Sequence, residues 1–115
     1  MLGLTSRWID VAPGKLHIYD SLAPHDARNP PLVLIHGMCT TGQSMALLGL
    51  LLARHSRRII VIDLIGFDFG FSATSPGTPR NPSIMQHVDW VPLLLDAIQL
   101  NIGCTQLDLC GHSFG

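Results

Sequence analysis

Two short runs of the chain are apolar at every position, and an earlier region alternates. Residues 32–35 (Leu-Val-Leu-Ile) and 59–62 (Ile-Ile-Val-Ile) contain no polar side chain. Strands that are covered on both faces, as in parallel sheets, have this composition, so we predict two buried strands. Residues 7–11 and 15–20 alternate between apolar and polar positions around Pro13-Gly14, a dipeptide typical of tight turns. This pattern predicts a hairpin ahead of the buried strands.

A helical pattern follows each buried strand. Residues 43–55 are rich in helix formers, and we predict a helix there. After a long loop over residues 63–81, apolar residues recur at three- and four-residue spacing and predict one buried helix face: Ile84, Val88, Val91, Leu95 and Ile98. We expect this helix to begin at Asn81-Pro82, with Asn81 as its cap, and to end at Gly103. Pro92 is expected to kink or break it.

A third strand is predicted at residues 106–110, so strands alternate with helices along the chain. This alternation predicts an α/β fold with right-handed crossovers and a mostly parallel sheet. The 115 residues suffice for one small domain, and no repeat or linker divides them. We therefore treat 1–115 as a single unit.

Composition narrows the classes of function. The chain is 47% hydrophobic and only 13% charged, with a net charge of −1. That balance gives no electrostatic basis for binding nucleic acid or an anionic membrane. The longest apolar run, residues 46–53, is too short to span a bilayer, and the first eight residues do not resemble a signal peptide. Nothing in the pattern specifies an oligomeric state.

The three cysteines predict a reducing environment. Cys39, Cys104 and Cys110 are odd in number and lie in apolar segments, so we expect buried, reduced thiols. Their spacing relative to the six histidines matches no zinc site, and we expect no metal. A cytoplasmic location follows from these expectations.

The last five residues, 111–115, read Gly-His-Ser-Phe-Gly and fit the pattern G-x-S-x-G. In a nucleophile elbow, the serine lies on a strained turn between a strand and a helix, and its hydroxyl points into a cleft. Glycines flank it because the backbones approach too closely for a Cβ. Ser113 is therefore the candidate nucleophile for acyl transfer.

Three segments in this order resemble the α/β-hydrolase superfamily, and specifically its serine-nucleophile branch of esterases and lipases. They are His-Gly-Met at 36–38 after the first buried strand, Asp-Leu-Ile-Gly at 63–66 after the second, and the elbow after the third. The resemblance implies the front half of that fold, with strand order 1-2-4-3-5. It also implies an oxyanion hole made by the backbone N–H groups of Met38 and Phe114, a small-molecule acyl substrate and no cofactor.

This chain departs from the superfamily pattern in one loop, and its elbow residue argues against two branches of the superfamily. Serine at the elbow argues against the epoxide hydrolase and haloalkane dehalogenase branches, which resemble this family but use aspartate there. The loop after Asp63 is two residues longer than the common D-x-x-G-x-G-x-S pattern, and the additional Phe67-Asp68 could disturb packing beneath the elbow. Nothing upstream decides between water and another acyl acceptor.

The triad of this family follows the chain order Ser, Asp or Glu, then His, and only two residues follow Ser113. We therefore expect the acid and the base to lie outside this chain, which by itself is expected to be inactive. The alternative is a non-catalytic truncated form that acts at most as a binding or interfering module.

The remaining polar residues have structural interpretations. We expect His36 to hold the oxyanion loop through hydrogen bonds and Asp63 to cap loop backbone at its strand end. His112 is expected to line a wall rather than serve as the base. Surface or rim positions are predicted for four further histidines: His17, His25, His55 and His87.

A rival motif lies at residues 37–44, which match the phosphate-binding loop G-x-x-x-x-G-K-[ST] except at Gln43. Gln43 replaces the lysine that neutralises the phosphates, and a neutral amide cannot supply that charge. These residues are better interpreted as an oxyanion turn that is followed by a helix.

Overall fold

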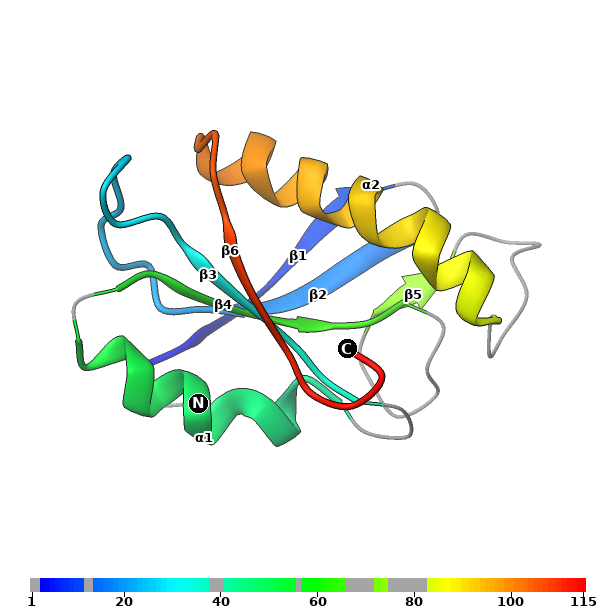
Figure 1. Ribbon diagram of the computed structural model, residues 1–115, viewed down its shortest axis with the longest axis horizontal. Helices are drawn as coiled ribbons and strands as arrows, with labels where there is room; N and C mark the ends of the chain where they lie inside the picture. Colours follow the sequence, from blue (N-terminus) through cyan, green and yellow to red (C-terminus); the bar gives the residue numbers. More distant parts are fainter. Residues whose placement is uncertain (1–2, 12–13, 38–40, 56, 66–71, 75–82) are drawn as a thin grey trace.

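The computed structural model describes residues 3–11, 14–37, 41–55, 57–65, 72–74 and 83–115. Figure 1 shows a twisted sheet with one helix on each face, α1 on one side and α2 on the other. Two apolar layers fill the spaces between sheet and helices. The α2-side core includes Leu16, Ile18 and Ile62, and the α1-side core includes Tyr19 and Val61. The predicted α/β class is confirmed.

The sheet order agrees with the resemblance. The strands are β1 (Thr5–Val11), β2 (Gly14–Asp20), β3 (Leu32–Ile35), β4 (Ile59–Asp63), β5 (Ala73–Thr74) and β6 (Asp108–Gly111). Their order is β1-β2-β4-β3-β6, and β5 pairs with β2 away from this path. The hairpin and the β2–β4 contact are antiparallel, whereas β3 is parallel to both β4 and β6. The predicted hairpin and the three later strands are confirmed.

One strand was not predicted. The loop expected over residues 63–81 contains β5, whose Ala73 and Thr74 pair with Lys15 and Gly14 of β2. Two residues of this kind carry no periodic pattern, so they form a strand only because β2 offers them a partner. The additional Phe67-Asp68 lies outside the described residues.

Helix α1 (Gln43–Ala53) follows β3 as predicted and ends two residues earlier than expected. It lies close to β4 because Gly49 has no side chain: a Cβ there would be 3.0 Å from Cγ2 of Val61. Met45 and Ala46 are buried on the same side of the helix, whereas Leu47 is 70% exposed.

Helix α2 (Ile84–Ile102) begins later than the sequence suggested. Its cap is Ser83, whose hydroxyl accepts the N–H of Gln86 while the Gln86 side chain accepts the N–H of Ser83. The predicted cap at Asn81 is therefore wrong, and Asn81-Pro82 lies outside the described residues. The helix runs through Pro92 without interruption and ends at Gly103 (φ 80°), as predicted.

The buried face of α2 is rotated from the predicted one. Ile84 and Val88 are 63% and 56% exposed, whereas Leu94 and Ile98 are buried. His87, at the same helical spacing, is buried as well. Two sets of positions therefore repeat at three- and four-residue intervals: the predicted set, and a second set at 87, 91, 94 and 98. The second set faces the sheet, although its histidine makes it the less hydrophobic of the two.

Cys104 and Cys110 are free and only partly buried, so the prediction of buried thiols is wrong for both, and Cys39 lies outside the described residues.

Among the helices of the described residues, none is long and apolar enough to cross a bilayer.

Two leucines of α2 form a matched test of this packing. Leu94 is 1% exposed and Leu100 is 86% exposed. We expect Leu94→Ala to lower the free energy of unfolding by about 2–5 kcal/mol, because it removes buried apolar contacts and leaves a cavity. Leu100→Ala should change it by less than about 0.5 kcal/mol. Urea denaturation followed by circular dichroism measures both, and similar losses would contradict the observed helix orientation.

Candidate active site

The residues after β6 form the strained turn that the sequence predicts. Ser113 has a φ of 58°, in the left-handed region that non-glycine residues rarely adopt. Hydrogen bonds fix both sides of it: His112 N–H donates to Ile35 O at 3.1 Å, and Gly115 N–H donates to His112 O at 3.1 Å. Ser113 is exposed. We call this strained turn, residues 111–115, the elbow; the role of Ser113 as a nucleophile stays a prediction.

Both elbow glycines occupy places where a side chain cannot fit. A Cβ on Gly111 would overlap the carbonyl group of Gly115. A Cβ on Gly115 would overlap Ile35 O and lie 2.8 Å from His36 O. The expected close approach is therefore confirmed, and it involves β3 as well as the two ends of the elbow.

Gly37, two residues after the end of β3, lies against the serine. A Cβ on Gly37 would be 3.4 Å from Ser113 Cβ and 3.2 Å from His112 O. Met38, a predicted oxyanion donor, lies outside the described residues. Phe114, the other predicted donor, belongs to the elbow, and its ring packs edge-on against His87 with centroids 5.2 Å apart. The two donor roles stay predictions.

An apolar cavity of about 350 Å³ opens beside the elbow. It is lined by Ile35, Leu64, Ile84, His87, Val88, Val91, Pro92, Phe114 and Gly115. Because the two residues after Ser113 belong to its wall, an apolar group held in the cavity would lie next to the serine.

His36 joins Gly37, just after β3, to Leu64, just after β4; residues 38–40 of the expected oxyanion loop lie outside the described residues. Its Nδ1–H donates to Gly37 O at 2.8 Å, and its Nε2 accepts the N–H of Leu64 at 2.9 Å. Nε2 can accept only when it carries no proton, so this tautomer is assigned from the hydrogen bonds. Burial lowers the pKa of His36 below its usual value, against opposing effects of the Gly37 hydrogen bond and the Asp63 charge.

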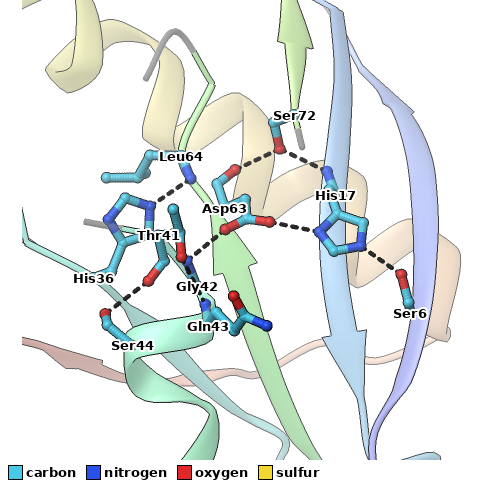
Figure 2. A network of polar contacts seen from close by, with 10 residues as sticks. All are labelled: Ser6, His17, His36, Thr41, Gly42, Gln43, Ser44, Asp63, Leu64 and Ser72. Atoms are coloured by element: carbon cyan, nitrogen blue, oxygen red, sulfur yellow. Dashed lines mark hydrogen bonds and ion pairs between the residues drawn. The ribbon is translucent and has the colours of Figure 1, made fainter. Parts of the chain in front are cut away.

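Asp63, the residue before Leu64, is the centre of a second set of contacts, shown in Figure 2. Its carboxylate accepts the N–H of Gly42 at the start of α1 and contacts His17 Nδ1 at 2.5 Å. Its carbonyl accepts the hydroxyl of Ser72 at 2.5 Å, and the Ser72 hydroxyl accepts the N–H of His17 at 2.7 Å. The expected role of Asp63 as a cap for loop backbone is confirmed.

The position of Asp63 also decides against the phosphate-loop interpretation. The carboxylate accepts the N–H of Gly42, the N-cap of α1, where a phosphate would have to bind. A Cβ on Gly42 would be 2.8 Å from Asp63 Oδ1. A buried negative charge at this distance repels a phosphate, so this helix start is already occupied.

Two of the four histidines predicted at the surface are buried. His17 is 1% exposed and His87 is 4% exposed, so the expectation is wrong for both. His17 lies on β2, which is paired on both sides, and every residue from Leu16 to Asp20 is buried there. His25 is half-buried, whereas His55 and His112 are exposed. The part of the chain that the structure describes contains no cluster of three ligands able to hold a metal.

Comparisons with known proteins support the fold. No protein-family model matches the chain, and no curated protein matches it in sequence. An epoxide hydrolase from an endophytic Streptomyces matches 100% of this chain over 31% of its own length, with a TM-score of 0.76 and 24% identity. An epoxide hydrolase from Vigna radiata matches 98% of this chain over 33% of its own length, with a TM-score of 0.73 and 20% identity.

A third structure, epoxide hydrolase A from Mycobacterium thermoresistibile, gives a TM-score of 0.74 and 18% identity over 97% of this chain and 32% of that one. The chain therefore has the fold of the first third of an α/β-hydrolase and spans about a third of the length of these structures. At these identities the likeness concerns the fold alone.

Burial of His36 and His87 predicts a loss of stability in acid. Burial also lowers the pKa of His87, and the nearby His36 adds to that effect. Below about pH 6.5 the unfolded chain therefore binds protons that the folded chain does not, and the free energy of unfolding falls until the lowered pKa values are reached. We expect lower stability at pH 5.5 than at pH 7.5 in urea titrations.

Substitution of one of these histidines tests the cause. His36→Gln should make the free energy of unfolding less dependent on pH between these two values, because its side chain cannot bind a proton. His55→Gln, at an exposed position, serves as the matched control and should leave the dependence unchanged. An unaltered pH dependence in the His36 variant would show that another group is responsible.

Proposed function

We propose that this chain carries the nucleophile-elbow portion of a serine hydrolase of ester or related acyl substrates. The observation that carries the proposal is Ser113, exposed with a φ of 58° on a turn that two backbone-contacting glycines permit. This strain is the expected cost of pointing a hydroxyl out of a strand–turn connection. The adjacent apolar cavity supports an acyl group as the part of the substrate that binds there.

In the proposed reaction, the Ser113 hydroxyl attacks the carbonyl carbon and the N–H groups of Met38 and Phe114 stabilise the oxyanion. The contact between Gly37 and the elbow supports this assignment, because Gly37 directly precedes Met38 in the chain. His36 keeps that turn in position but is a poor candidate for the base. Both of its ring nitrogens are engaged, with Gly37 and Leu64.

The matched structures are epoxide hydrolases, and this chain shares their fold. We nevertheless place the chemistry with serine esterases, because the residue at the elbow decides which covalent intermediate can form. Attack by serine on an acyl group gives an ester that water hydrolyses after proton abstraction. The resemblance assigns aspartate to this position in the epoxide hydrolase branch.

The base for Ser113 is proposed to lie outside the 115 residues. The ring nitrogens of His36 and His17 are engaged with Gly37, Leu64, Ser6 and Asp63. An unassisted serine hydroxyl is a weak nucleophile at neutral pH. We therefore propose that the 115-residue chain has no esterase turnover.

A fluorophosphonate probe tests this function. We expect Ser113 to be labelled slowly in the 115-residue chain, because no base accepts its proton. In a fusion with the other two thirds of a serine hydrolase of this fold, labelling should become fast, and Ser113→Ala should abolish it. Met38→Pro should then cost about 10²–10³ in labelling rate, since it removes a backbone donor, and Met38→Leu far less. Rapid labelling of Ser113 in the 115-residue chain would overturn the proposal.

A further inference from the structure

A serine that does have a histidine and an aspartate lies elsewhere in the molecule. Ser6 Oγ is 2.5 Å from Nε2 of His17, and Nδ1 of His17 is 2.5 Å from Oδ2 of Asp63. Figure 2 shows the three side chains in one row across the sheet, from β1 through β2 to β4. Strand register produces this row: His17 pairs directly with Asp63, and Ser6 pairs with Tyr19, two residues from His17.

The hydrogen bonds fix the direction in which a proton can move. Asp63 already accepts the N–H of Gly42, so its carboxylate acts as an acceptor. An ionised carboxylate accepts at Oδ2 as well, so we assign the proton of this contact to His17 Nδ1; in the neutral ring Nε2 then presents a lone pair to Ser6. The Ser6 hydroxyl donates to that lone pair. This is the arrangement in which a histidine removes a proton from a serine and an aspartate stabilises the resulting imidazolium.

The exposure of the three residues suits a serine that is activated by a histidine and an aspartate. Asp63 and His17 are both 1% exposed, whereas Ser6 is exposed on the edge strand β1. Water is thus kept from the acid and the base, and Ser6 is the exposed member of the row. Next to it, the Trp8 ring is 55% exposed with its centroid 4.7 Å from that of His17. An aromatic group of a reagent can stack there while its electrophilic atom meets Ser6.

We propose that Ser6, activated by His17 and Asp63, is a covalent acylation site for aryl esters and related activated acyl compounds, separate from Ser113. The Ser6 oxygen forms a bond to the carbonyl carbon as its proton passes to His17 Nε2. The bond to the aryl oxygen then breaks, and the leaving group takes the proton from His17. The products are one O-acylated serine and one phenol. The proposal covers this half-reaction only, so each chain reacts once.

The same fluorophosphonate probe tests this site in the 115-residue chain, where the serine oxygen bonds to phosphorus and fluoride leaves. Trypsin separates the candidates: Ser6 lies in the peptide that ends at Arg7, and Ser113 in the peptide that begins after Arg80. Ser44 and Ser83 are exposed serines whose hydroxyls contact only backbone groups, and they serve as internal references. Fragmentation of each labelled peptide identifies the modified residue.

We expect Ser6 to be labelled at least about 100-fold faster than Ser44 or Ser83, since general-base assistance contributes about 10²–10⁴. Ser6→Ala should abolish this labelling and Ser113→Ala should leave it unchanged. His17→Gln should lower it to the reference level, and so should unfolding of the unaltered chain in urea, which removes the geometry without a substitution. Labelling of Ser6 no faster than that of the references would overturn the proposal. The rate at Ser113 is measured separately, so either proposal can fail alone.

Discussion

The buried carboxylate of Asp63 joins the parts of the fold that must meet around the elbow. A charge with 1% exposure is tolerated only when hydrogen-bond donors replace the lost water, and here the donors come from Gly42 and His17. One is the first amide of α1 and the other belongs to the hairpin. The next residue along, Leu64, donates its N–H to His36. Asp63, the last residue of β4, and Leu64, which follows it, therefore bind Gly42 and His36, the two ends of the segment between β3 and α1.

The sheet was predictable because the sequences of its central strands, β3 and β4, fit no other kind of element. Residues 32–35 and 59–62 are apolar throughout, and only a strand covered on both faces suits so short a run. The elbow was predictable for a similar reason, since Gly111 and Gly115 stand where backbone contacts exclude any side chain. In both cases a local steric or solvation constraint determines the structure, so a few adjacent residues suffice to reveal it.

The errors have two causes. At the start of α2 two local signals compete: Asn81-Pro82 fits a helix start, but so does the capping box of Ser83 and Gln86, which is the one that forms. At His17 the cause is tertiary. The partners of His17 are 11 and 46 residues away in sequence. No motif encodes those separations, because they result from strand register. A histidine in a strand that is paired on both sides is the one sequence signal that could have indicated burial.

The position of β6 has a consequence for the order in which the molecule can be assembled. β6 pairs with β3, yet β4 and both helices lie between them in sequence. During synthesis, one edge of β3 must therefore stay open until residues 108–111 emerge. The elbow needs that edge, because His112 N–H binds Ile35 O and Gly115 packs on the same carbonyl. The strained backbone at Ser113 can thus form only after β6 has paired with β3, late in the folding of these residues.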